Sequence, residues 1–189
     1  MTRRNRRCIL PKRLRAEEYL KEARELFTFS MKGTPLQTDF SMLRAARAKA
    51  RKALLLDPSN YQAVLLLAHI LADCDDRASS EEALRYYDVA VSLHPEDPEP
   101  YDGKASVLLF DLDRPAEAEH FARQAISRAL RQRDADSLEM TYTTLIAALM
   151  EQGKSAEARR ALREAERRCP TESMRDLVAN TLKELPAES

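Results

Sequence analysis

The sequence is poor in the residues on which many functions depend. It has 189 residues but no tryptophan and only three glycines, three cysteines and three histidines. Because the glycines are isolated from one another, no glycine-rich loop is available to hold a phosphate. No run approaches the roughly 20 apolar residues of a membrane-spanning helix, and no cluster of Val, Ile and Thr marks a strand. These absences argue against a phosphate-loop enzyme, a membrane-spanning protein and a β-sheet protein.

Catalytic and metal-binding groups are equally scarce. His69, His94 and His120 have no cysteine or carboxylate at the spacing of metal ligands. Cys74 lies among aspartates, whose negative charge disfavours the reactive thiolate. The aspartates of residues 73–76 lack the glycine and the terminal glutamate of a calcium loop, so we expect a solvated acidic turn there. We therefore expect no enzyme activity, no metal site and no cofactor.

The cysteine spacing and the start of the chain bear on location. An odd number of widely spaced cysteines fits neither a disulfide framework nor a zinc site, and it indicates a reducing compartment. The basic start is not followed by the apolar run of a secretory signal. We therefore expect a cytoplasmic protein. Arginine outnumbers lysine 23 to 8, which favours a GC-rich, bacterial genome.

Opposite charges are separated along the chain, although the formal net charge is zero. Residues 73–119 carry fourteen acidic and four basic residues, whereas residues 1–15 carry no acidic residue. The basic arm of those first fifteen residues contains Arg3, Arg4, Arg6, Arg7, Lys12, Arg13 and Arg15. We expect this arm to be a disordered, solvated tail, or to bind an acidic protein surface or a polyanion such as RNA. Base stacking is not supported, because no aromatic residue is interleaved with the arginines.

What the sequence does contain is an internal repeat. The pattern Ala-x-x-Leu-x-Pro occurs at residues 53–58 and again, 37 residues later, at residues 90–95. Four pairs of alanines are spaced seven residues apart, namely Ala46 and Ala53, Ala83 and Ala90, Ala118 and Ala125, and Ala158 and Ala165. Two such alanines lie on one face of a helix, where small side chains let a second helix approach closely. The second alanines recur at steps of 37, 35 and 40 residues, which indicates stacked helix pairs.

This pattern resembles the tetratricopeptide repeat, which has about 34 residues and an Ala…Ala…Pro pattern in and after its second helix. The matching residues, over roughly 41–170, are Leu67, Ala68, Leu71, Ala83, Tyr87, Ala90 and Pro95; Tyr101, Ala105, Leu108, Ala118, Phe121 and Ala125; and Tyr142, Leu145, Leu149, Gly153, Ala158, Ala165 and Pro170. The family's tryptophan is replaced by Val64, Tyr101 and Tyr142. The resemblance implies an all-α fold, a right-handed α-solenoid of stacked antiparallel helix pairs.

We expect five segments along this solenoid. They are a basic arm at 1–11, a divergent helical pair at 12–57, three repeat units at 58–95, 96–134 and 135–170, and a C-terminal capping helix and tail at 171–189. The terminal capping helix is needed for solubility, because each repeat buries its apolar surface only against its neighbours. Within the first unit, Ser79 followed by Glu82 predicts a capping box at the start of the second helix.

The resemblance also implies a concave groove, lined by the first helix of each pair, that holds a peptide or a helix of a partner. The expected groove residues are Gln62, Leu66, His69, Glu99, Asp102, Ser106, Leu109, Phe110, Thr143, Ala147 and Met150. Its acidic margin favours a basic or amphipathic segment of a partner protein, and Met150 is an adaptable apolar anchor. We therefore expect a non-catalytic scaffold, such as an adaptor, an assembly factor or a chaperone.

Other interpretations stay open. His69, Leu65 and Leu109 are equally explained as residues that pack between helices. The chain is alternatively a structural subunit that its basic arm anchors in a larger complex, or a binder of RNA or another polyanion through that arm. The arm is also expected to suit the acidic groove of its own chain or of a second copy, which would give self-association. The sequence names no partner.

Overall fold

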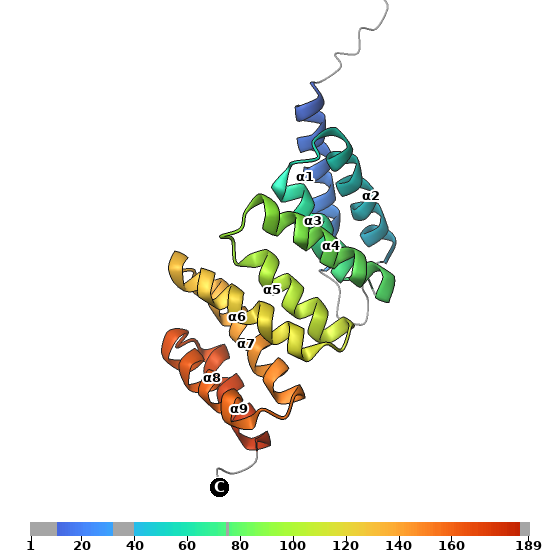
Figure 1. The fold of residues 1–189 in the computed structure, drawn as a ribbon. Helices are drawn as coiled ribbons and strands as arrows, with labels where there is room; N and C mark the ends of the chain where they lie inside the picture. The colour runs from blue at the N-terminus through green and yellow to red at the C-terminus, as the bar shows by residue number, and fades with distance from the viewer. Residues whose placement is uncertain (1–10, 32–39, 75, 186–189) are drawn as a thin grey trace, which may run out of the picture. The chain divides into compact units, whose positions relative to one another are not determined.

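The computed structural model describes residues 11–31, 40–74 and 76–185, and these are helical with no strand among them (Figure 1). The chain divides into two compact units, Met1–Cys74 and Asp75–Ser189. The boundary therefore falls inside the repeat expected at residues 58–95. The expected all-α class is confirmed, and each unit is built from antiparallel helices packed in sequence order.

Unit 1 consists of three helices, α1 (Lys12–Ser30), α2 (Phe40–Leu56) and α3 (Tyr61–Ala72). α1 packs along α2, and α2 packs on α3. Ala16 and Ala23 of α1 are 1% and 0% exposed, so α1 carries a buried alanine pair at the same seven-residue spacing. α3 buries eight of its twelve residues, because its sequence is apolar on nearly every side.

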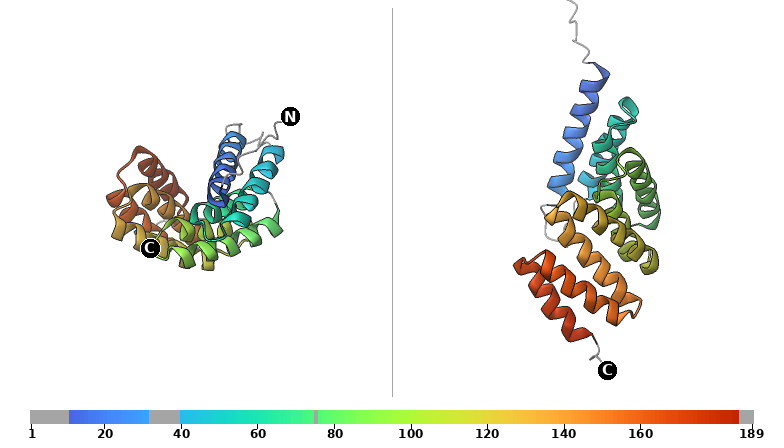
Figure 2. Two further views of the ribbon diagram at one scale, coloured as in Figure 1. Left: turned by 90° about the horizontal axis from the view of Figure 1, so that it is seen from above. Right: turned by 60° about the vertical axis from the view of Figure 1, so that its left-hand side comes forward.

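Unit 2 contains the other helices. They are α4 (Arg77–Leu93), α5 (Glu99–Ser106), the short π-helix η1 (Val107–Asp111), α6 (Pro115–Gln132), α7 (Ala135–Glu151), α8 (Ser155–Arg168) and α9 (Glu172–Glu184). Each helix packs against the next, and α5 also packs against α7. Short connections make successive helices antiparallel, as α8 and α9 show in Figure 2. This arrangement is the one expected of helix pairs that stack in series.

The alanine pairs form the contacts between helices, as their spacing indicates. All eight alanines from Ala46 to Ala165 that define the four pairs are 0% exposed. A larger side chain at any of these positions would overpack the contact between two helices, which typically costs about 1–3 kcal/mol. The repeat in the sequence is therefore a repeat of close helix–helix approaches.

The helix starts differ in part from the expected ones. The prediction of a capping box at Ser79 and Glu82 is wrong. The residue that caps α4 is Asp76, three residues before Ser79. The Asp76 carboxylate accepts hydrogen bonds from the backbone N–H of Ser79 at 2.8 Å and from its hydroxyl at 2.6 Å. Asp134 caps α7 in the same way through Ser137, at 3.1 Å from its backbone nitrogen. An aspartate at the N-cap satisfies a backbone donor that the first turn leaves free.

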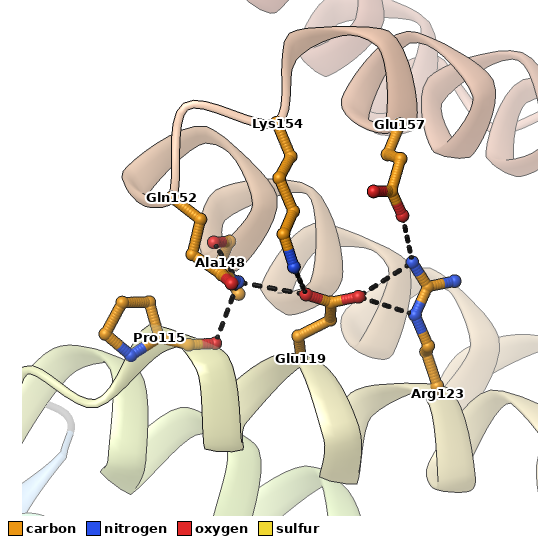
Figure 3. Close-up of polar contacts among 7 residues, drawn as sticks. All are labelled: Pro115, Glu119, Arg123, Ala148, Gln152, Lys154 and Glu157. Carbon is orange, nitrogen blue, oxygen red and sulfur yellow. Dashed lines mark hydrogen bonds and ion pairs between the residues drawn. The ribbon is translucent and has the colours of Figure 1, made fainter.

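A polar network fixes the start of α6 to the turn between α7 and α8 (Figure 3). The Glu119 carboxylate accepts hydrogen bonds from Lys154 Nζ at 2.7 Å and Gln152 Nε2 at 3.0 Å, and it pairs with Arg123 at 2.8 Å. Arg123 also reaches Glu157 at 2.8 Å. Burial would raise the pKa of Glu119, but these hydrogen bonds outweigh it and lower the pKa. The network thus stabilises an ionised carboxylate between three helices.

The described residues were also compared with the requirements of a membrane-spanning helix and of a metal site. Among them, no helix combines the length and the apolar character that crossing a bilayer requires. No group of three or more His, Cys, Asp or Glu side chains within the described ranges could hold a metal ion.

Candidate partner-binding site

The expected groove residues divide between the two units. Gln62, Leu66 and His69 lie on α3 of unit 1, and the remaining eight lie on α5, η1 and α7 of unit 2. In unit 1, Gln62 Oε1 accepts a hydrogen bond from Arg24 Nη2 at 3.2 Å. Leu66 is 7% exposed and belongs to the core, and burial lowers the pKa of His69, which favours its neutral form.

In unit 2 the exposed part of the expected groove follows one side of α5. Glu99, Asp102 and Ser106 are spaced by three and four residues, so they lie on the same face of the helix. Phe110 continues this line on η1 and is 67% exposed, whereas its neighbour Leu109 is 7% exposed and packs in the core. An apolar ring so exposed is a natural contact for an apolar ligand group.

Phe110 lies in the π-helix η1, where the backbone turn is wider than in an α-helix. The backbone N–H of Leu112 donates to the carbonyl of Val107 at 3.2 Å, five residues back, and Arg114 N–H donates to Leu108 at 2.8 Å. A π turn holds one more residue than an α turn and is often found at functional sites. The chain then reverses at Asp113, whose φ of 54° is left-handed. This wide turn could not be predicted from the sequence, because residues 107–112 contain no proline or glycine.

The α7 side of the site is less polar. Thr143 is exposed, and Ala147 and Met150 are partly exposed. Met140 was missed by the sequence analysis although it is 65% exposed. It precedes Thr143 and Ala147 by three and seven residues and shares their face, so helical spacing would have found it. We call Glu99, Asp102, Ser106 and Phe110, together with these four residues of α7, the α5–α7 face.

The acidic end of the α5–α7 face is electrostatically strained. Burial raises the pKa of Asp102 to about 6, although the neighbouring Thr141 hydroxyl opposes part of this rise. The Thr141 hydroxyl also lies 2.7 Å from the carbonyl of Ser137, to which it donates, and Asp102 Oδ1 is buried without a hydrogen-bond partner. The Asp102 carboxylate is therefore incompletely solvated by the protein.

Neighbouring carboxylates add to this strain. Partial burial raises the pKa of Glu99, and the negative charges of Asp97, Asp102 and Asp134 raise it further. Asp134 reaches this cluster from the N-cap of α7, a contribution that the sequence analysis missed. A positive charge from outside the protein would stabilise the ionised forms of these groups.

The basic arm lies mostly outside the described residues. Arg3, Arg4, Arg6 and Arg7 are not described, so the expected disorder of residues 1–11 concerns a stretch of which only Pro11 is described. The last three basic residues instead begin α1, which starts at Lys12. Arg13 pairs with Glu17 at 3.4 Å, whereas the Nε of Arg15 is buried without a partner. The arm and the first helix therefore overlap.

The fold and the packing of unit 2 define a helical-repeat protein, since helix pairs with buried alanine contacts recur along the chain. No protein-family model matches the chain, and no curated protein matches its sequence at a significant level. Solved structures identify the kind of repeat: they have the tetratricopeptide-repeat fold, and this chain shares it. The resemblance stated from the sequence is confirmed at the level of the fold.

Three of these structures illustrate the match. TTC0263 of Thermus thermophilus is 16% identical, with a TM-score of 0.67 over 88% of this chain and 81% of its own. PilF of Pseudomonas aeruginosa is 16% identical, with a TM-score of 0.67 over 91% of this chain and 71% of its own. The TPR2B domain of yeast Sti1, solved in complex with pHsp70, is 19% identical, with a TM-score of 0.61 over 73% of this chain and 98% of its own.

Proposed function

We propose that the chain is a non-catalytic protein-interaction scaffold whose α5–α7 face binds a basic, amphipathic segment of a partner protein. The observation that carries the proposal is the crowding of Glu99 and Asp102, whose pKa values are both raised, on the helix face that continues to the exposed ring of Phe110. A lysine or arginine of the ligand would relieve the repulsion by pairing with the exposed Glu99 carboxylate next to Asp102. An apolar side chain of the same ligand would cover Phe110.

The shared fold supports this kind of ligand. Sti1 TPR2B was solved in complex with pHsp70, so a domain of this fold is able to form a complex with another protein. The expected contacts Gln62 and His69 lie on α3 of unit 1 and are not part of this face. Roles as an adaptor, an assembly factor or a chaperone all use such a face.

The alternative functions rest on the basic arm. A fixed place in a larger assembly, self-association through the arm, and RNA binding each require arginines that lie outside the described residues. No described contact favours any of them over binding at the α5–α7 face. Electrostatic complementarity, by contrast, gives the acidic face a stated ligand chemistry.

The proposal is tested with a fluorescein-labelled twelve-residue peptide of alternating leucine and arginine, titrated by fluorescence anisotropy. Asp102→Lys and Met150→Glu reverse the charge and the apolar character of the face, and we expect each to weaken binding at least tenfold. Asp176→Lys on α9 is the matched control, because Asp176 is exposed and lies outside the face. A peptide with glutamate in place of arginine is the control ligand.

Two outcomes contradict the proposed function. One is equal affinity for the arginine and glutamate peptides. The other is equal loss of affinity in Asp102→Lys and Asp176→Lys, which would mean that overall charge, and not this face, attracts the peptide.

A further inference from the structure

A second concavity lies between the second helices of two successive pairs in unit 2. α6 and α8 form its walls, α7 forms its floor, and its volume is about 510 Å³. The floor consists of Tyr142, Leu145 and Leu149, and Ile126 and Ala161 contribute apolar surface from the walls. A volume of this size and an apolar lining with a few polar groups are typical of sites for small ligands. We call it the α6–α8 groove.

The α6–α8 groove is separate from the α5–α7 face. Tyr142, Leu145 and Leu149 are three and four residues apart and share one side of α7. Thr143 and Ala147 project from another side of the same helix, because each residue turns the helix by about 100°. A ligand in the groove therefore leaves the proposed peptide-binding face free.

The groove has a closed end and a polar end. Arg123 of α6 and Glu157 of α8 lie across one end and form an ion pair of 2.8 Å. Glu164 marks the other end, seven residues along α8, or about 10 Å at the rise of an α-helix. Glu164 is itself paired with Arg168 at 2.8 Å. Three of the four charged side chains that line the groove are thus already neutralised.

Two hydrogen-bond donors of the groove are not fully satisfied by the protein. Arg160 lines the groove on α8 and has no hydrogen bond or ion pair with any described residue. Tyr142 is 1% exposed, and its buried hydroxyl makes no hydrogen bond of ordinary geometry. Burial raises the pKa of Tyr142 to about 12, and the charge of the nearby Glu164 carboxylate and a weak hydrogen bond to it add to this rise, so the hydroxyl keeps its proton. Buried tyrosine hydroxyls normally find a partner.

Both of these donors line the same groove. Arg160 and Glu164 are four residues apart on α8 and therefore share a face, and the Tyr142 hydroxyl lies near Glu164. The groove thus combines an apolar floor, an unpaired cation and a neutral donor that Glu164 pairs with only weakly. A carboxylate joined to an apolar group is the chemistry that satisfies all three.

We propose that the α6–α8 groove binds an apolar group that carries a carboxylate. The apolar part lies on Leu145, Leu149 and Ala161. The carboxylate pairs with Arg160, and one of its oxygens accepts the hydrogen bond from Tyr142. Two sources supply this chemistry: a free alkyl carboxylate, or the C-terminal residue of a peptide that ends in leucine.

Isothermal titration calorimetry on the full chain tests the proposal. The probes are octanoate, with octanol and octylammonium as controls, and an acetylated Gly-Gly-Leu-Leu peptide with a free or an amidated C-terminus. We expect the carboxylate form of at least one pair to bind. Arg160→Gln should weaken it about tenfold and Tyr142→Phe by about threefold to tenfold, whereas Glu164→Gln should strengthen it because a like charge is removed.

Two further variants separate the groove from general effects. Ala161→Phe fills the groove and should abolish binding, and circular dichroism checks that it still folds. Arg167→Gln removes the same charge from α8 at an exposed position outside the groove, and it should leave the affinity unchanged. Asp102→Lys should also leave it unchanged, because the proposal does not depend on the α5–α7 face.

Each outcome decides the proposal. Binding of octanoate that Arg160→Gln weakens supports a free carboxylate as the ligand, and binding of the peptide acid alone supports a chain end. The proposal is overturned if neither carboxylate binds at millimolar concentration, if octanol or octylammonium binds as well as octanoate, or if Arg167→Gln weakens binding as much as Arg160→Gln does.

Discussion

Gly103 of α5 lies against the ring of Tyr87 of α4. A Cβ atom on residue 103 would lie 2.4 Å from Cζ and 2.6 Å from the hydroxyl oxygen of Tyr87. Tyr87 is 2% exposed and is therefore not free to move away. The small residue is needed here because two helices cross closely, and not because of an unusual backbone angle.

Gly103→Ala is therefore expected to destabilise unit 2, although alanine is the better helix former. The gain in helix propensity is about 1 kcal/mol, and overpacking of a buried contact costs about 1–3 kcal/mol. We expect a net loss of up to about 2 kcal/mol in the free energy of unfolding, measured by urea denaturation. Ser106→Ala, on the same helix but partly exposed, is the control. A variant as stable as the native chain would show that Tyr87 relaxes at no cost.

The Glu119 network predicts that neutralising a largely buried carboxylate lowers the free energy of unfolding more than neutralising an exposed one does. The Glu119 side chain is 13% exposed and binds Lys154 and Arg123. Glu119→Gln keeps the shape but removes the charge, so we expect a loss of about 1–2 kcal/mol. Glu117→Gln is the matched control, because Glu117 is 52% exposed in its pair with Arg114 and should cost less than about 0.5 kcal/mol. Equal effects in urea denaturation would contradict the assigned role of the network.

The raised pKa of Asp102 predicts how stability depends on pH. An unperturbed aspartate carboxyl has a pKa of 3.8, whereas the pKa of Asp102 in the folded protein is about 6. Between these values the folded state keeps a proton that the unfolded state has lost. The free energy of unfolding therefore falls as the pH rises from about 4 to about 6, by on the order of 2 to 3 kcal/mol, and the loss persists at higher pH.

Asp102→Asn removes this titration and isolates it from other groups. The variant should be more stable than the native chain at pH 7.5, and the difference should vanish near pH 4, where the native carboxyl is protonated. Urea denaturation at pH 4, 5, 6 and 7.5 measures both curves. Parallel curves for the two proteins would mean that Asp102 titrates normally in the fold.

The fold was predictable because each repeat contains two small residues at a fixed spacing. Alanines seven residues apart can be read directly, and those of the four pairs are 0% exposed. The π turn at residues 107–111 could not be predicted, because its Val-Leu-Leu-Phe stretch contains no residue that breaks a helix. Phe110 of this turn is exposed, as its place in the repeat led us to expect.

The polar ends of the two sites depend on contacts between distant segments. Tyr101 and Tyr142 both replace the family's tryptophan, yet only Tyr101 finds hydrogen-bond partners, in Arg128 at 2.7 Å and the carbonyl of Pro95 at 3.1 Å. The difference arises because Arg128 of α6 reaches the Tyr101 hydroxyl, whereas the arginine near Tyr142, Arg168, pairs with Glu164. Sequence spacing identifies the position but not whether its hydroxyl is satisfied.

Substitution of Phe110 should affect ligand affinity without affecting the stability of the fold. Because its side chain is 67% exposed, Phe110→Ser should change the free energy of unfolding by less than about 0.5 kcal/mol. The same substitution removes the apolar contact of the α5–α7 face, so the affinity for the leucine–arginine peptide should fall about tenfold. Phe29→Ser is the matched control, since Phe29 is 61% exposed on α1 in unit 1. If both variants weaken binding equally, the peptide adheres to exposed aromatic rings in general, and the acidic face has no special role in its capture.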